Sequence, residues 1–190
     1  MAVGRDFFRG PTLELCKRLL GAELVHGETA GLIVEVEAYI GPGDRAAHSY
    51  GGRRTKRTEV MFGPPGFAYV YISHGIHYCF NVVSGEEGNP EAILVRALQP
   101  TRGIEIMRER RRCQDDRELT NGPGKLCQAL GITLEHYGWD LTQPPFFIRP
   151  GQTLRDEDIA CGPRIGIDSA GEARYYPWRF WIKGNPYVSR

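Results

Sequence analysis

The sequence predicts an α+β fold: a single compact domain with a largely antiparallel, curved sheet, surrounding helices and a protruding β-hairpin. Its 190 residues, 41% hydrophobic and 25% charged, suit one globular domain over residues 1–190. Two alternating apolar runs, at residues 67–73 and 76–83, surround His74-Gly75, a pattern typical of a hairpin. Strands joined by hairpins, with helical patterns between them, favour a mixed fold with antiparallel pairing.

The other elements follow from local signals along the chain. Thr12 before an apolar helical pattern and Gly21 after it predict a short, capped helix. Two further helices are expected at residues 102–113 and 125–130. The expected strands are residues 23–26, 32–39, 67–73, 76–83, 92–98, 146–149, 164–168 and 178–183.

Charge and cysteine content exclude a few classes of protein. The formal net charge of +1 neither requires nor excludes nucleic acid, because local patches matter more than totals. Five cysteines without paired spacing indicate reduced thiols rather than a disulfide framework or a zinc site. No apolar segment suits a signal peptide or a membrane span, so we expect a cytosolic protein. We expect no metal or cofactor, because the histidines lack ligand spacing.

The most informative segment is residues 34–49, VEVEAYIGPGDRAAHS. Alternation along a strand places Glu35, Glu37 and Tyr39 on one face, with Ile33, and aliphatic residues on the other. An acid beside aromatic surface is a candidate general base, because partial desolvation raises its pKa toward working pH. The alternative is a half-exposed strand with solvated glutamates, which this segment by itself slightly favours.

Polar residues also interrupt the apolar strands that follow. Arg96 lies among aliphatic residues, so we expect it to pair with Glu37 or Glu35, either structurally or to position a carboxylate and its water. Asn81 needs hydrogen-bond partners, so it is either bonded to backbone or directed at a ligand. His74, at the hairpin tip, projects outward, either for insertion into a partner or as a solvated turn residue.

Basic residues cluster in two places. Residues 53–57 (RRTKR) follow the acidic strand in a loop that contains glycines, and residues 108–112 carry four arginines around one glutamate. Either cluster could bind a phosphate backbone. The first is the better candidate, because it neighbours the proposed site and its glycines let backbone amides approach phosphates. Residues 121–125 (NGPGK) lack the leading glycine and the Ser/Thr of a phosphate loop.

Six strings occur in a consistent order between about Leu13 and Ser189: VEVEAYIGPGDRAAHS, GGRRTKRTEVMF, YVYISHGIHYCFNVV, LVRALQP, NGPGKLCQALGI and PRIGI. Together they closely resemble the alkyladenine (3-methyladenine) DNA glycosylase family of base-excision repair. The resemblance implies a monofunctional glycosylase that flips an alkylated or deaminated purine out of double-stranded DNA. The lesions implied are of the 3-methyladenine, hypoxanthine and etheno-adenine class, and the N-glycosidic bond is hydrolysed by a glutamate-activated water.

The resemblance also implies roles for individual residues. Glu37 matches the general base, and Arg96 matches an arginine that holds the attacking water together with the backbone carbonyl of Ile165. The positions matching the base pocket are Tyr39, His48, Tyr71 and Asn81, the last of which excludes guanine. The positions matching DNA contacts are Arg53, Thr55, Arg57 and Met61.

One position departs from the family pattern. His74 stands at the hairpin tip where the family places an intercalating tyrosine. An inserted side chain fills the gap that a flipped nucleotide leaves, and the smaller histidine should form a weaker wedge. We therefore expect a preference for lesions that already weaken base pairing.

Three alternatives to the glycosylase remain. A nucleoside or sugar hydrolase could use Glu35 and Glu37 together, since carboxyls two residues apart on a strand have a spacing compatible with glycoside chemistry. A non-enzymatic nucleic-acid-binding module would explain the basic segments, and a catalytically weak damage-binding protein would keep the pocket. For the glycosylase we expect a monomer without membrane association, at the nucleoid of a bacterium or in the nucleus of a eukaryote.

Overall fold

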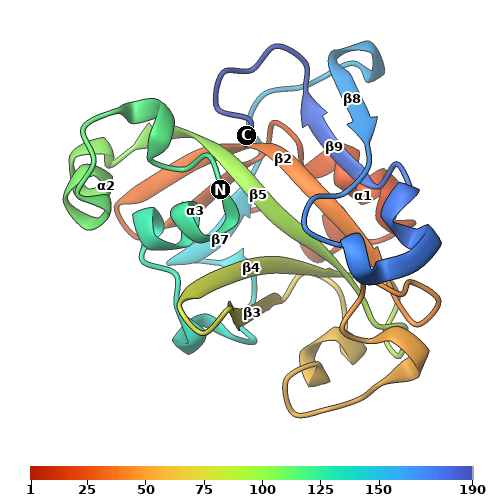
Figure 1. The fold of residues 1–190 in the computed structure, drawn as a ribbon. Helices are drawn as coiled ribbons and strands as arrows, with labels where there is room; N and C mark the ends of the chain where they lie inside the picture. Colours follow the sequence, from red (N-terminus) through yellow and green to blue (C-terminus); the bar gives the residue numbers. More distant parts are fainter. Residues whose placement is uncertain (190) are drawn as a thin grey trace.

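The computed structural model describes residues 1–189 and confirms the α+β fold, with helices packed around one curled antiparallel sheet (Figure 1). The described residues form three α-helices: α1 (Thr12–Leu19), α2 (Ile104–Arg111) and α3 (Pro123–Leu130). The strands are β1 (Glu23–His26), β2 (Thr29–Ile40), β3 (Ala68–Ser73), β4 (His77–Ser84), β5 (Glu91–Arg102), β6 (Thr142–Gln143), β7 (Phe146–Arg149), β8 (Ile159–Gly162) and β9 (Arg179–Ile182).

The centre of the sheet is the pairing of β2 with β5, which are twelve residues long each. Strands follow the order β3-β4-β5-β2-β1-β7-β6, and β9 pairs with both β2 and β8. Figure 1 shows β2 and β5 crossing the middle of the molecule, with the β3–β4 hairpin below them and β8 and β9 above. Because β9 pairs with Glu35–Glu37 of β2, the C-terminal part of the chain lies against the acidic segment.

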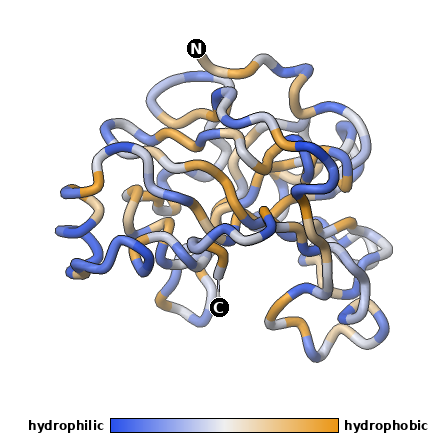
Figure 2. The backbone as a smooth tube through the Cα atoms, turned by 90° about the horizontal axis from the view of Figure 1, so that it is seen from above, coloured by the Kyte–Doolittle hydropathy of each residue, from blue (hydrophilic) through white to orange (hydrophobic). Residues whose placement is uncertain are grey.

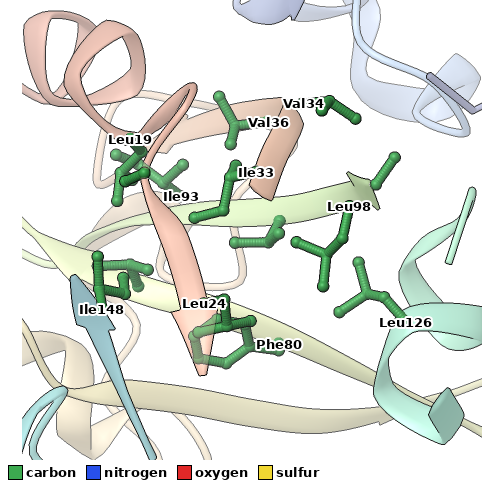
Figure 3. Packing of buried hydrophobic residues seen from close by; sticks show 14 of the residues in the cluster. Leu19, Leu24, Ile33, Val34, Val36, Phe80, Ile93, Leu98, Leu126 and Ile148 are labelled. Carbon is green, nitrogen blue, oxygen red and sulfur yellow. The ribbon is translucent and has the colours of Figure 1, made fainter. Parts of the chain in front are cut away.

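The main hydrophobic core fills the space between one face of the sheet and helices α1 and α3 (Figure 3). Leu19, Val36 and Leu126 are fully buried there, and each such side chain contributes about 1.5–3 kcal/mol. Hydrophobic segments run through the middle of the molecule, whereas peripheral loops are more hydrophilic (Figure 2). By strand alternation, the other face carries a smaller cluster of Met61, Tyr69, Val83 and Ala92.

Strand β2 departs from the simple alternation that the sequence predicted. Its pairing with β5 shifts register between Ile33 and Glu35 and again between Glu35 and Val36. Such bulges add a residue to one strand and rotate the side chains around it. As a result Ile33 packs in the main core rather than beside the acids, and Glu35 and Glu37 are both 0% exposed. The alternative of solvated glutamates is therefore wrong.

The strand predicted at residues 164–168 is also wrong. This segment is a loop that leads into a 3-10 helix, η7 (Asp168–Tyr175), and the strand of this region is β8, which precedes it. Gly166 has a φ of +76°, which lies outside the regular strand conformation, and the Arg164 side chain is buried. The short strand β6 had no sequence signal.

The predicted helices are confirmed with shifted ends. Helix α1 begins at Thr12 itself, after Pro11, and the Thr12 hydroxyl donates a hydrogen bond to Ser84 Oγ (2.8 Å) instead of capping the helix. Strand β5 continues to Arg102, and α2 begins only after Gly103, whose φ of +75° separates strand from helix.

The arginine cluster of α2 makes contacts within the protein. Arg108 forms an ion pair with Asp116 (2.8 Å), and Arg110 donates a hydrogen bond to the carbonyl of Ala129 at the end of α3 (3.0 Å). Arg111 donates to the carbonyl of Leu119 (3.1 Å). These contacts tie α2 to its neighbours and give the cluster a structural role.

The chemistry of the cysteines agrees with expectation. All five are unpaired thiols, of which three are buried. Among residues 1–189, no helix has both the length and the apolarity that crossing a membrane requires.

Candidate active site

A cavity of about 560 Å³ opens between the loop after β2, the β3–β4 hairpin and the loop after β8. Most of the predicted site residues meet there although the sequence separates them widely. The lining includes Tyr39, His48, Arg57, Met61, Tyr71, His74, Asn81, Arg96 and Ile165. Three predicted residues lie elsewhere: Glu37 lies behind the lining, and Arg53 and Thr55 lie in the neighbouring loop.

Glu37 is a fully buried acid whose partners all line the cavity. The Ile165 N–H donates to its Oε1 (2.9 Å), and Arg96 Nη1 lies 3.1 Å from the same oxygen. The Tyr39 hydroxyl donates to Oε2 (2.7 Å). The Glu37 carboxylate therefore lies directly behind the cavity lining. Tyr39, Arg96 and Ile165, which all line the cavity, each contact it.

The electrostatics of Glu37 are balanced between burial and its partners. Burial raises the pKa of Glu37 above its ordinary value, and the Arg96 charge, the Ile165 N–H and the Tyr39 hydroxyl offset part of that rise. A carboxylate of this kind can stay ionised beside its cation and still accept a proton more readily than a solvated one. This is the behaviour that a general base requires.

Glu35, the other buried acid of β2, accepts hydrogen bonds from protein groups on both of its carboxylate oxygens. Its Oε1 accepts from Arg96 Nε (3.3 Å), Arg179 Nη1 (3.3 Å) and Ser189 Oγ (2.9 Å). Its Oε2 accepts from the Ser189 N–H (2.7 Å). Arg96 thus bridges the two acids, with Nε on Glu35 and Nη1 on Glu37, so both partners considered from the sequence are real.

Aromatic rings form two walls of the cavity. On one wall the rings of His48 and Tyr71 are nearly perpendicular, with centroids 4.6 Å apart. On the other wall Tyr39 is backed by the guanidinium of Arg164, 4.9 Å from the ring centroid. Burial raises the pKa of both Tyr39 and Tyr71, so both walls are uncharged at neutral pH.

His48 is also held neutral. Its Nδ1 lies 2.7 Å from the Tyr69 hydroxyl, and Arg57 Nη2 approaches its Nε2 at 3.2 Å. Desolvation in the pocket and the Arg57 charge lower the pKa of His48 to about 4. The wall can therefore stack on a flat ligand without carrying a charge of its own.

The floor of the cavity includes the buried amide of Asn81. Asn81 is 3% exposed, and its Nδ2 donates to the carbonyl of Tyr69 (3.2 Å), which fixes the orientation of the amide. The residue is thus both bonded to backbone and directed at the cavity. Met61, 1% exposed, packs beside Tyr69 in the smaller cluster, so its side chain supports the floor.

Side chains of the loop at residues 53–59 contact one another and the wall of the cavity. Arg54 pairs with Glu59 (2.6 Å), and the Thr55 N–H donates to Thr58 Oγ1 (2.9 Å). Arg57 stacks on the Tyr71 ring, 4.7 Å from its centroid.

His74 occupies the hairpin tip with a backbone φ of +51°, a conformation that histidine tolerates better than most residues. Its Nδ1 lies 2.9 Å from Ser73 Oγ. Next to it Ile76 is 74% exposed, so the tip presents an imidazole and an aliphatic side chain to the outside.

The sequence analysis missed a buried pair that holds the site together. Asp44, to which the sequence analysis assigned no role, accepts from both terminal nitrogens of Arg164 (2.5 and 2.9 Å), and neither side chain is exposed. Arg179 and Ser189, the partners of Glu35, had no recognisable signal either. Among residues 1–189 no group of three or more potential metal ligands occurs.

Comparison with known proteins decides the family. Residues 6–186 match the family model for methylpurine-DNA glycosylase. The chain belongs to this family. A Bacillus licheniformis protein provisionally named 3-methyladenine DNA glycosylase is 56% identical over 189 residues, which cover 97% of this chain and 95% of that protein. An Oceanobacillus iheyensis protein with the same name is 51% identical over 192 residues, covering 99% and 96%.

Membership of the methylpurine-DNA glycosylase family confirms the resemblance that the six strings indicated. The chain is a DNA repair enzyme of base-excision repair, a hydrolase that acts on N-glycosyl bonds in DNA. The family accounts for a cavity with neutral aromatic walls beside a buried acid, because a flat base must be held while its bond to the sugar is cleaved. It also argues against the non-enzymatic binding module.

Proposed function

We propose that this protein is a monofunctional glycosylase that flips damaged purines out of double-stranded DNA and hydrolyses their N-glycosidic bond with a water activated by Glu37. The observation that carries the proposal is the convergence of Tyr39, Arg96 and Ile165 on the buried Glu37 carboxylate at the edge of an aromatic cavity. The lesions are purines of the 3-methyladenine, hypoxanthine and etheno-adenine class.

The base is held by stacking rather than by charge. Tyr39 lies on one side of it and His48 with Tyr71 on the other, and all three rings are neutral at pH 7. Stacking of a base on aromatic side chains contributes about 1–3 kcal/mol per base, which offsets the cost of flipping. Asn81 meets the edge of the base, where its fixed amide disfavours the exocyclic amine of guanine.

Hydrolysis then proceeds at the sugar carbon that carries the base. The water oxygen bonds to C1′, one water proton passes to Glu37, and the C1′–N bond breaks with its electron pair leaving on the purine. Arg96 and the backbone carbonyl of Ile165 hold the water, and the carboxylate stabilises the positive charge that develops on the sugar. Because Tyr39 occupies Oε2 of Glu37, its hydroxyl yields this oxygen or shares it when water arrives.

The site favours water over an amine nucleophile. The residues that line the cavity in the described chain include no lysine, so no Schiff base with the sugar forms and the strand is left uncut at the abasic site. A sugar hydrolase that uses two carboxylates is disfavoured, because Glu35 is already bonded by Arg96, Arg179 and Ser189. Residues 1–190 form a single glycosylase domain that acts as a monomer. The protein acts where the chromosomal DNA lies, at the nucleoid of a bacterium.

DNA outside the cavity is held by the loop after β2 and the hairpin tip. Arg53, Thr55, Arg57 and the backbone near Met61 contact phosphates, and His74 enters the space that the flipped nucleotide leaves. No metal or cofactor takes part in these steps.

The test is single-turnover release of base from duplexes that contain etheno-adenine, hypoxanthine or 3-methyladenine, with a chelator present. Wild type, Glu37→Gln and the surface control Glu14→Gln are compared, and the free nucleosides form a separate arm. We expect release from duplex only, by wild type and Glu14→Gln, leaving an alkali-labile but uncut strand. Loss of a general base slows release by about 10²–10⁴-fold.

Three results would contradict the proposal. Binding without release from any lesion would indicate a damage-binding protein. Release from free nucleosides would indicate a nucleoside hydrolase. Strand cleavage without alkali would indicate an amine nucleophile.

A further inference from the structure

Arg45 is an exposed cation at the rim of the cavity to which neither the sequence nor the family comparison assigns a role. It lies in the loop after β2, on the side of the cavity formed by Ile165 and the residues that follow. Among residues 1–189 it has no ion-pair partner, whereas Arg54 in the same loop is neutralised by Glu59. An arginine without an acid at the mouth of a DNA site is available for an anion.

The backbone on both sides of Arg45 is fixed. The Asp44 carboxylate accepts hydrogen bonds from the N–H groups of Ile40 (3.1 Å) and Ala46 (3.0 Å) while it binds the buried Arg164. The backbone at Arg45 is therefore held in place by these contacts. When a ligand binds, only the Arg45 side chain must lose conformational freedom.

The guanidinium of Arg45 rests against a glycine of the opposite segment. At Gly171 the backbone has φ +62° and ψ −134°, and a Cβ added there would lie 3.0 Å from Arg45 Nη1. The lack of a side chain at Gly171 leaves room for the guanidinium on this side of the cavity. Arg57 lies on the hairpin side, stacked on Tyr71, so unpaired cations border the cavity on two sides.

A flipped nucleotide presents one phosphate on each side of its sugar. The cavity takes the base, so both phosphates stay at its mouth and need cations on both sides. We propose that Arg45 binds a backbone phosphate next to the flipped nucleotide, and that Arg57 and Arg45 hold the strand from opposite sides of the mouth. This inference rests on the proposed function, since it requires a nucleotide flipped into this cavity.

Salt dependence of DNA binding tests the contact, because each neutralised phosphate contributes about 0.9 to the slope of log K against log[salt]. The Glu37→Gln protein is the parent, since under the proposed function it should bind an etheno-adenine duplex without releasing the base. Arg45→Gln and Arg45→Lys are added to it. Lys17→Gln is the matched control, which removes one positive charge from α1 on the other face of the sheet.

We expect Arg45→Gln to lower the slope by about 0.9, so that raising salt from 50 to 200 mM weakens its binding about threefold less than it weakens the parent. Arg45→Lys and Lys17→Gln should keep the slope of the parent. An unchanged slope in Arg45→Gln, with the parent binding normally, overturns the Arg45 contact and leaves the proposed function intact. A parent that does not bind the duplex overturns both.

Discussion

Arg164 and Asp44 form a fully buried, two-point ion pair that joins the two loops on either side of the candidate active-site cavity, with N–O distances of 2.5 and 2.9 Å. Arg164 also lies between the rings of Tyr39 and Trp178, with 4.9 and 5.0 Å to their centroids. The next residue along, Ile165, donates its N–H to Glu37. One buried cation therefore positions together an aromatic wall and a hydrogen-bond partner of Glu37, the proposed general base.

Removing one member of this pair should be severely destabilising. In Asp44→Ala the Arg164 charge stays buried without its acid, which costs about 3–5 kcal/mol of unfolding free energy. The exposed pair Arg155–Asp158 is the control, since Arg155→Gln there should leave the free energy of unfolding almost unchanged. Urea denaturation of the variants measures both values. Similar small losses in the two variants would show that the buried pair does not anchor the loops.

The acid limb of the pH–rate profile should report the hydrogen bond from Tyr39 to Glu37. In the proposed mechanism Glu37 must be ionised to accept a proton, so activity should be lost as pH falls through its pKa. The Tyr39 hydroxyl is one of the contacts that lower this pKa against the effect of burial. Tyr39→Phe removes that contact, so the pKa rises and the acid limb moves to higher pH.

Single-turnover rates between about pH 4 and 8 measure the shift, since the range must span the ordinary pKa of a glutamate and a raised one. Tyr71→Phe is the matched control, because it removes a hydroxyl from the opposite wall without touching Glu37. An acid limb that stays in place, or moves to lower pH, in Tyr39→Phe would show that Glu37 is not the group that titrates.

Glu35 should matter for stability and for the position of Arg96 rather than for chemistry. Glu35→Gln leaves Arg96 and Arg179 around a neutral amide, which should cost about 3–5 kcal/mol of unfolding free energy. At a temperature where the variant is folded, base release should slow by about tenfold or less, against about 10²-fold or more for Glu37→Gln. Equal losses of rate in the two variants would place both carboxylates in the reaction.

The sequence predicted which residues meet at the cavity better than it predicted the scaffold behind them. Alternation and composition were enough to predict the hairpin, and the family strings brought Tyr39, Arg96 and Ile165 to one site. The bulges around Glu35 were not predictable. A register shift depends on how β2 pairs with β5, and the sequence of β2 alone contains no signal for it. Alternation along β2 was compatible with two solvent-exposed glutamates. The register shift helps to explain why Glu35 and Glu37 are buried instead.

Long-range polar pairs escaped prediction for a related reason. Asp44 and Arg164 lie 120 positions apart, and each has an ordinary local interpretation, in a turn and in a supposed strand. Ser189, 154 positions further along the chain, donates its backbone N–H to the Glu35 carboxylate. Only the fold brings such groups together, and a single sequence contains no signal for the pairing.

The hairpin tip provides the last prediction, which concerns the wedge. His74→Tyr enlarges the side chain that would fill the gap in the duplex, so binding to a hypoxanthine or etheno-adenine duplex should tighten by about three- to tenfold. The same change should cost about 1 kcal/mol of stability, because the φ of +51° at this position suits histidine better than tyrosine. Affinity measured in the Glu37→Gln background, together with urea denaturation, separates the two effects.

His77→Tyr is the control for the wedge. His77 is an exposed neighbour in β4 that lies beyond the turn. If His74→Tyr changes neither affinity nor base release, His74 does not enter the duplex, and the exposed Ile76 is the remaining side chain at the tip that could do so.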